Sequence, residues 1–370
     1  MTTMMQLQTR RDDLAHTRIV SHPLPALTAG EALLRIDRLA VTSNNITYAA
    51  FGDVPHLRYW DFFPTGHQDW GHMPAWGFAT VEHSTVSGVE EGERYYGYWP
   101  VATHAVVQPI RVSERGFYDG CEHRQTLTSA YNQYQRCTTD AAYRPETEDL
   151  QCLLRPLFIT SFMLADFLED NAFFGAEQLL YSSASSKTAF GTAFCLRHAS
   201  LQQTGLTSAR HQPFVQGLGC YGNALDYDSL PGLDAGTATV YVDFSGRQAL
   251  RQQVHSHFDR QLTYSCFAGS AQSHDFLTPA EAAALPGPKP ELYFAPYQIR
   301  KRNADWGAAE VTRRFNQAQL AFYDYVQDPQ HRRLSTTAHH GLEAARLLIA
   351  ELVEGHINPQ QGHIVRPIGT

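Results

Sequence analysis

The sequence predicts an α/β protein in which a β-rich part is followed by a doubly wound parallel sheet covered by helices. Two observations carry this prediction. Short apolar runs separated by turns dominate the chain up to about residue 150, whereas from Gly175 onward β-rich runs alternate with helical stretches. A length of 370 residues is enough for about two to three domains with a sizeable core.

The first part contains extended segments that suit an antiparallel, partly closed β unit. They are predicted at residues 32–36, 77–81, 95–98 and 103–107, and the turn 87–92 carries two glycines.

The second part alternates strands with helices, which is the pattern of a parallel sheet. Strands are predicted at residues 179–182, 205–208, 221–225, 239–244, 262–268 and 291–295, and helices at 187–203 and 248–258. Near the end of the chain, apolar residues at helical spacing predict a helix over 342–353 that stops at Gly355, followed by a strand at 363–365.

Composition narrows the class of protein. The net charge of -8 and the lack of like-charge blocks argue against binding to nucleic acid or to an anionic membrane surface. Polar residues interrupt the most apolar segment, 156–167, and charged residues at 10–13 precede any apolar run, so we expect neither a membrane span nor a secretory signal. Six scattered cysteines without a CxxC pair indicate reduced thiols in a cytoplasmic protein.

A turn of small residues between the strand 179–182 and the following helix is the sharpest local signal. Small side chains let backbone N–H groups approach a phosphate, the helix N-terminus favours an anion, and hydroxyls add hydrogen bonds. The usual glycines are absent, so a simple helix cap is the alternative. The candidate cofactor-binding residues are Ser183, Ser185, Ser186, Lys187 and Thr188.

The next predicted strand ends where the adenosine ribose lies in a dinucleotide-binding fold. Thr207, Ser208 and Arg210 stand there, and no acidic residue occurs between Ser200 and His211. An arginine with neighbouring hydroxyls suits a 2′-phosphate, so NADP(H) is predicted in preference to NAD. The alternative for Arg210 is an ordinary surface charge.

Several segments resemble the medium-chain dehydrogenase/reductase superfamily, in particular its zinc-free, quinone-oxidoreductase-like branch, and within it a divergent bacterial family of unknown function. The segments are 31–36, 42–48, 59–64, 77–95, 175–180, 218–227, 343–355 and 362–365. The resemblance implies a GroES-like catalytic domain from 1–150 and 306–370, a Rossmann NADP-binding domain from 151–305 with the nicotinamide in the cleft between them, and a homodimer.

The resemblance also implies a pocket for the nicotinamide and a small-molecule substrate lined by Asn44, Asn45 and Tyr48. Their amides and phenol could orient a carbonyl or donate a proton. The alternative is that the asparagines cap or turn the chain and that Tyr48 packs in the core. An aromatic stretch could roof a hydrophobic site or belong to the core: Tyr59, Trp60, Phe62, Phe63, Trp70 and Trp76.

We expect no metal. The histidine of the superfamily's catalytic Gly-His-Glu motif is missing at 75–77, and only Cys121 and Cys137 lie in the region of the structural zinc lobe. His67 and His72, with Asp69 between them, are the remaining metal candidates, and hydrogen-bonding histidines are the commoner case.

These features together predict an NADPH-dependent, zinc-independent oxidoreductase that transfers a hydride to a small carbonyl, enone or quinone-type substrate. The alternative is a catalytically weak NADP(H)-binding protein of the same fold. A hydrolase using Ser183 or Ser185 ranks below both, because no Gly-x-Ser-x-Gly elbow surrounds either serine.

Overall fold

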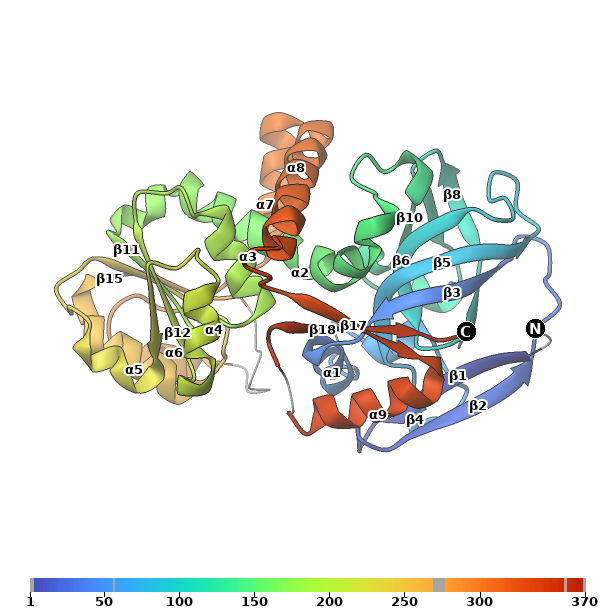
Figure 1. The fold of residues 1–370 in the computed structure, drawn as a ribbon, viewed down its shortest axis with the longest axis horizontal. Helices are drawn as coiled ribbons and strands as arrows, with labels where there is room; N and C mark the ends of the chain where they lie inside the picture. Colours follow the sequence, from blue (N-terminus) through green and yellow to red (C-terminus); the bar gives the residue numbers. More distant parts are fainter. Residues whose placement is uncertain (1–2, 56, 269–276, 356–357, 369–370) are drawn as a thin grey trace. The chain divides into compact units, whose positions relative to one another are not determined.

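The computed structural model describes residues 3–55, 57–268, 277–355 and 358–368. They form two compact units: unit 1 is Met1–Leu153 with Ser335–Thr370, and unit 2 is Leu154–Leu334 (Figure 1). The sequence analysis set its second boundary at 305/306, and the structure differs in keeping the following helix with unit 2. The domain assignments themselves stay a prediction.

Unit 1 is built mainly on antiparallel strands. In the described part of the chain, its large sheet has the order β17-β18-β3-β5-β6-β10-β9-β8, with β7 also pairing to β3. The bounds are β3 (Ala32–Ala40), β5 (Pro74–Ser84), β6 (Arg94–Pro100), β7 (His104–Val107), β8 (Pro109–Ser113), β9 (Gly116–Asp119), β10 (Gln133–Arg136), β17 (Ser335–His340) and β18 (Gln361–Arg366).

The two ends of the chain meet in this sheet, because β18 pairs antiparallel with β3. A second, smaller sheet joins β1 (Thr3–Arg10), β2 (Thr17–Pro23) and β4 (Trp70–Gly71). Two helices complete the unit, α1 (Ser43–Ala50) and α9 (Gly341–Val353). The apolar side of α9 is buried in the same core as β3 and β5, as its Leu342, Leu348 and Leu352 show.

Unit 2 is a parallel sheet with the strand order β13-β12-β11-β14-β15-β16. Read in chain order this is 3-2-1-4-5-6, the arrangement of a dinucleotide-binding fold. The bounds are β11 (Gln178–Tyr181), β12 (Gln202–Thr207), β13 (Asn223–Asp226), β14 (Thr239–Asp243), β15 (Leu262–Phe267) and β16 (Glu291–Leu292). The predicted fold class, a β-rich part plus a doubly wound parallel sheet, is confirmed.

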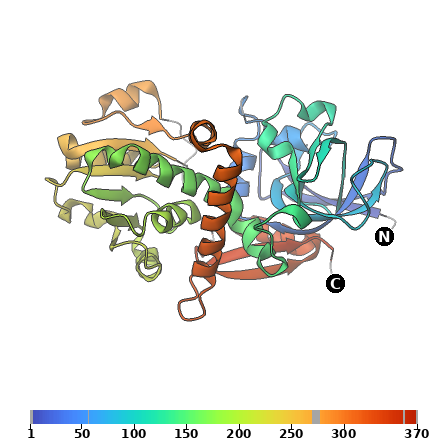
Figure 2. The same ribbon diagram turned by 90° about the horizontal axis from the view of Figure 1, so that it is seen from above.

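Between α1 and α9, the described chain forms the α-helices α2 (Glu148–Asp170), α3 (Lys187–Cys195), α4 (Gln212–Gly217), α5 (Gln248–Phe258), α6 (Pro279–Ala284), α7 (Ala295–Trp306) and α8 (Ala308–Gln327). Figure 2 shows α8 as the long orange helix. Phe322 of α8 stacks on Phe158 of α2 with ring centroids 4.6 Å apart, which explains why α8 belongs to unit 2.

Two predicted elements of unit 2 are shorter than expected. The helix predicted over 187–203 ends at Cys195, and β12 already begins at Gln202. The strand predicted over 291–295 stops at Leu292, because Pro296 occupies the first turn of α7, where a missing N–H costs no helical hydrogen bond.

One helical span, Pro145–Asp170, is long and apolar enough to cross a membrane by length and composition alone, and 56% of its most apolar window is buried within the fold. Phe158, Met163, Leu164 and Leu168 on this span are at most 1% exposed, as in a core helix.

Candidate functional site

The turn after β11 is tight and built without glycine. Ser183 adopts the left-handed region with φ 47°, a conformation that glycine usually supplies. The Ser186 N–H donates to the Ser183 carbonyl (2.8 Å). The Ser186 side chain in turn caps α3 by accepting from the Ala189 N–H at 3.3 Å. The predicted small-residue turn at a helix N-terminus is therefore present, and it contains the helix cap as well.

This turn lies directly against β12. A Cβ atom at Gly205 would come within 2.7 Å of the Ala184 Cβ, so only glycine allows the two segments to approach this closely. The Ala184 N–H donates to the Leu206 carbonyl at 3.0 Å, and the Tyr221 hydroxyl donates to the Ala184 carbonyl at 3.0 Å. These contacts fix the turn at the carboxyl edge of the sheet.

The structure brings the hydroxyls of the two predicted cofactor segments together. Thr207, the last residue of β12, donates from Oγ1 to the Ser185 Oγ at 3.4 Å. Ser208 follows at the start of a short 3-10 helix, Ala209–His211. Arg210 is exposed on that helix, and within the described ranges it forms no ion pair. Its cation is therefore available to an anionic ligand.

The carboxylate beside Thr207 is that of Asp226. Asp226 ends β13 beside Thr207, yet its Oδ1 accepts from the Ser229 N–H (2.8 Å) and the Ser229 hydroxyl (2.7 Å). Its Oδ1 thus caps the following 3-10 helix. The donor set at this edge consists of hydroxyls, backbone N–H groups and an arginine, which fits a nucleotide phosphate.

Lys187 and Thr188 form the first turn of α3 and are half-buried. Burial lowers the pKa of the Lys187 amine to about 8. The amine therefore keeps most of its charge at neutral pH.

Sequence reasoning missed Tyr227, which follows β13. Burial raises the pKa of its phenol, hydrogen bonding to Ser183 opposes that shift, and the Arg247 guanidinium lies over its ring at 5.2 Å.

In unit 1, Asn44, Asn45 and Tyr48 share the helix α1. The Asn45 side chain is used in local structure: its Oδ1 accepts from the Thr42 N–H at 2.7 Å, and its Nδ2 donates to the Pro74 carbonyl at 2.8 Å. Asn45 therefore closes a capping box and ties α1 to β5. Asn44 is half-buried on the same helix.

Tyr48 belongs to a cluster of aromatic rings and is 8% exposed. The Tyr59 ring lies 4.6 Å from it, and the Tyr98 ring packs against it edge-on at 5.8 Å. Burial raises the pKa of Tyr48 to about 12, and hydrogen bonding by the Trp76 side chain, followed by that of Asn44, opposes that shift. The phenol therefore keeps its proton at neutral pH and remains a hydrogen-bond donor.

Two buried donors border the same cluster. The Tyr98 hydroxyl has no hydrogen-bond partner among the residues that the structure describes, whereas the Trp76 side chain lies in hydrogen-bonding reach of the Tyr48 phenol. Tyr98 is wholly buried, and the ring centroid of Trp76 lies 5.1 Å from its own. Buried donors without partners are uncommon in folded proteins and call for an explanation such as a ligand or a water.

Sequence reasoning missed Arg124, which organises the rear of the aromatic cluster. It is 1% exposed and donates to the Asp119 Oδ2 at 2.7 Å, the Tyr134 hydroxyl at 2.8 Å and the Tyr131 carbonyl at 2.8 Å. Its guanidinium also lies 4.9 Å from the Phe63 ring centre. No local sequence motif predicts the role of Arg124, because its partners lie on β9, on β10 and on the 3-10 helix Ser129–Asn132.

The metal candidates stay apart from one another. His72 is 3% exposed and its Nδ1 lies 3.2 Å from the Leu7 carbonyl oxygen, whereas His67 is exposed. Within the described ranges, no three His, Cys, Asp or Glu side chains come together in a way that could hold a metal ion. The expectation of no metal stays a prediction.

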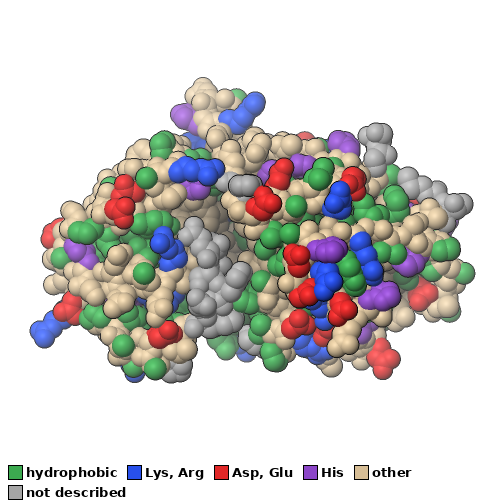
Figure 3. All heavy atoms as spheres, turned by 90° about the horizontal axis from the view of Figure 1, so that it is seen from below, with side chains coloured by type: hydrophobic (Ala, Val, Ile, Leu, Met, Phe, Trp, Pro, Cys, Tyr) green, Lys and Arg blue, Asp and Glu red, His purple; other side chains and the backbone are tan. Residues whose placement is uncertain are grey.

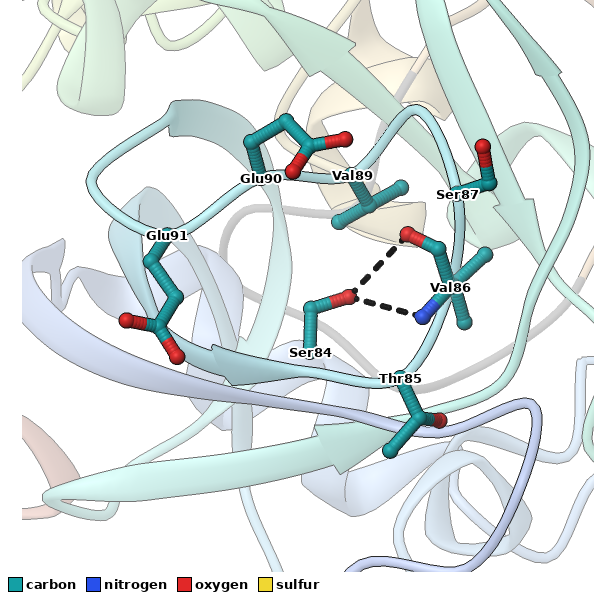
Figure 4. Close-up of a pocket in the computed structure, with 7 residues that line it drawn as sticks. All are labelled: Ser84, Thr85, Val86, Ser87, Val89, Glu90 and Glu91. Atoms are coloured by element: carbon teal, nitrogen blue, oxygen red, sulfur yellow. Dashed lines mark hydrogen bonds between the residues drawn. The ribbon is translucent and has the colours of Figure 1, made fainter.

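A hollow of about 560 Å³ lies on unit 1, in the turn after β5 (Figure 4). The Ser84 hydroxyl bridges the Val86 N–H and carbonyl there. None of the predicted site residues lines this hollow, so it does not bear on the predicted chemistry. Its lining residues are Ser84, Thr85, Val86, Ser87, Val89, Glu90 and Glu91.

The fold is like that of solved NADPH:quinone reductase and oxidoreductase structures, which confirms the fold that the resemblance implied. The chain itself belongs to the family described as "Protein of unknown function (DUF2855)", whose model matches residues 39–358. No curated protein matches the sequence significantly.

Solved structures resemble the chain over nearly its whole length. CurA from Vibrio vulnificus in complex with NADPH has a TM-score of 0.63 at 14% identity, covering 99% of this chain and 100% of that one. The Etr1p/NADP/crotonyl-CoA complex has a TM-score of 0.60 at 10% identity, covering 99% and 100%. The yhdH oxidoreductase from Salmonella enterica in complex with NADP has a TM-score of 0.54 at 14% identity, covering 98% and 99%.

Proposed function

We propose that the protein is an NADP(H)-dependent oxidoreductase that reduces a small carbonyl, enone or quinone-type substrate without a metal. The observation that carries the proposal is the carboxyl edge of β11 and β12, where a turn of small residues lies beside the Thr207 hydroxyl, Arg210 is exposed, and the Asp226 Oδ1 is used in a helix cap. The CurA, Etr1p and yhdH structures, which are complexes with NADPH or NADP, support the cofactor.

Each group at this edge of the sheet has a proposed role in binding NADP(H). The hydroxyls of Ser185 and Thr207 and the first-turn N–H groups of α3 bind phosphate oxygens, with the helix dipole favouring the anion. Arg210 pairs with the 2′-phosphate. When bound, NADP(H) supplies a hydride.

Tyr48 is proposed to donate a proton to the oxygen or carbon that becomes negative during reduction. A phenol whose pKa is raised to about 12 remains protonated across the physiological range, as a donor must. Asn44 is proposed to orient the substrate carbonyl, and Asn45 to hold the helix that carries both side chains.

The decisive experiment for the cofactor is a comparison of NADPH and NADH binding in Arg210→Ala. Loss of a charge-assisted pair costs about 1.5 to 3 kcal/mol, so the NADPH dissociation constant should rise by roughly tenfold or more, while NADH binding changes little. Fluorescence titration of each nucleotide measures both constants.

The matched control is Arg260→Ala. Arg260 is equally exposed but precedes β15, at the amino edge of the same sheet. It should leave both constants unchanged. Equal weakening of NADPH and NADH by Arg210→Ala would contradict the assignment of a 2′-phosphate site.

For the substrate side, Tyr48→Phe keeps the ring and removes the hydroxyl. With a substrate in hand, turnover should fall about a hundredfold or more while NADPH affinity and melting temperature stay nearly constant. Steady-state kinetics and thermal unfolding separate the outcomes. Unchanged turnover would remove Tyr48 from the mechanism, and a large fall in melting temperature would favour the core-packing alternative.

One observation favours the second candidate, a nucleotide-binding protein with little catalysis. Tyr48 is packed among rings, and the side chain of Asn45 is already used in a cap. That candidate predicts NADPH binding without substrate-dependent oxidation. A screen of aldehydes, enones and quinones that follows NADPH absorbance distinguishes the two.

A further inference from the structure

A buried hydroxyl joins the two central strands of the unit 2 sheet. Ser182 directly follows β11, and Asp243 ends β14, the neighbouring parallel strand. The Ser182 Oγ donates to the Asp243 Oδ1 at 2.7 Å and accepts from the N–H groups of Phe244 (2.9 Å) and Ser245 (3.0 Å). Its one donor and both lone pairs are thus used.

Asp243 holds the other side of this junction. Its Oδ1 also accepts from the Ser245 N–H at 2.9 Å, the Ser245 hydroxyl at 2.9 Å and the Gly246 N–H at 3.1 Å. Its Oδ2 accepts from the Nε (3.0 Å) and Nη2 (2.8 Å) of Arg251 on α5. Ser182 and Asp243 are at most 1% exposed, and Arg251 is 4% exposed. The carboxylate is therefore neutralised and fully bonded inside the fold.

The hydrogen bond between Ser182 and Asp243 lies where a nucleotide is expected to bind, so it bears on binding as well as on stability. β11 and β14 are the two strands between which the strand order reverses, and open parallel sheets bind ligands outside the carboxyl ends at that point. Ser183, with its left-handed backbone, is the next residue after Ser182. Fixing Ser182 therefore fixes the start of the turn whose N–H groups are proposed to meet the nucleotide.

We infer that Ser182 is a positioning residue. Its hydrogen bonds to Asp243 and to the backbone after β14 hold the turn after β11 in place, so that the backbone N–H groups of this turn are already oriented before the nucleotide binds. This inference rests on the proposed function. Hydrogen-bond donors that are already oriented lose less conformational entropy when the nucleotide binds, so the dissociation constant is lower.

The chain supplies a matched control in Ser265. It lies on β15, one strand further from the reversal point, is 1% exposed, and its hydroxyl contacts the His255 Nε2 at 3.0 Å. Ser265→Ala removes a buried hydroxyl bond of the same kind in the same sheet. If NADPH affinity depends on overall stability, both Ser182→Ala and Ser265→Ala should weaken it. If it depends on the position of the turn after β11, only Ser182→Ala should weaken it.

The experiment compares wild type, Ser182→Ala, Ser182→Cys and Ser265→Ala as full chains. NADPH affinity is titrated by fluorescence well below every melting temperature, and amide exchange is measured without nucleotide. We expect NADPH to bind about tenfold more weakly to both Ser182 variants and unchanged to Ser265→Ala. The amides of Phe244 and Ser245 should exchange faster in Ser182→Ala.

Three results would overturn the inference. Unchanged affinity in Ser182→Ala, with wild type binding normally, refutes the positioning role and leaves the proposed function standing. Wild-type affinity in Ser182→Cys shows that side-chain volume matters rather than hydrogen bonding, since a thiol bonds weakly. Absence of NADPH binding by the wild type itself removes the proposed function and this inference together.

Discussion

His72 is a buried neutral imidazole, and this makes stability depend on pH. Burial lowers its pKa to about 4, against roughly 6.5 in the unfolded chain. The unfolded state therefore binds the proton first, so stability is fully present above about pH 6.5 and falls as the pH drops toward 4. The loss amounts to about 3 kcal/mol by the end of that window.

Urea unfolding between pH 7 and pH 4.5 measures this slope. His72→Asn keeps a donor toward the Leu7 carbonyl and should flatten the profile, whereas His67→Asn, at an exposed site five residues earlier, should not. An identical slope in wild type and His72→Asn would show that other groups govern acid unfolding.

At the same scale, the sequence suggests candidates among residues next to a local motif, whose roles stay predictions, but it does not pair buried residues that lie far apart in the chain. Arg210 and the turn serines could be predicted because their spacing from a strand is local. Ser182 and Asp243 could not be paired in advance, since 61 residues separate them. Their contact exists only once β11 and β14 lie side by side.

At the scale of elements, the close approach of the turn after β11 to β12 gives a prediction for Gly205→Ala. The added methyl would lie 2.7 Å from the Ala184 Cβ, so the turn must move. We expect a loss of about 1 to 3 kcal/mol in unfolding free energy together with weaker NADPH binding. Chemical denaturation and nucleotide titration measure the two effects.

Gly217→Ala is the companion variant, because a Cβ there meets nothing within 4 Å. It ends α4 and should leave stability and NADPH affinity almost unchanged. If Gly205→Ala behaved in the same way, the close packing of turn and strand would be unimportant for either property.

The parallel strands were predictable because continuous apolar runs alternate with helices in the sequence. The helix α8 went unrecognised although Val311, Phe315 and Phe322 stand at helical spacing, a signal that was present. The helix α2 contains Pro156, a residue that usually argues against a helix interior, and its tertiary packing outweighs that local rule.

For the whole molecule, the metal-free assignment predicts the elemental content of the purified protein. We expect no stoichiometric zinc and unchanged NADPH binding after treatment with a chelator. Mass spectrometry for metals is the measurement. About one tightly held zinc per chain, removed only with loss of activity, would show the assignment to be wrong.

The charge distribution agrees with a small-molecule partner. Figure 3 shows acidic, basic and histidine side chains intermixed on the visible face, as the net charge of -8 without like-charge blocks suggested. The homodimer and the cytoplasmic location stay predictions. Neither follows from one chain, because assembly and compartment depend on surfaces and signals that a fold does not specify.

The pairing of β18 with β3 sets an order on folding during synthesis. β3 leaves the ribosome early, but β18 follows only after all of unit 2, Leu154–Leu334, has been made. At about 5 to 20 residues per second, the roughly 320 residues between β3 and β18 keep β3 waiting about 15 to 65 s for this partner. Unit 2, whose sheet uses residues from one continuous stretch, can close first. For tens of seconds the nascent chain thus exposes the end of β3 at Leu39 and Ala40, whereas β7 can already cover Ala32–Arg35 of the same strand, so the backbone groups open to a wrong partner are confined to that short end.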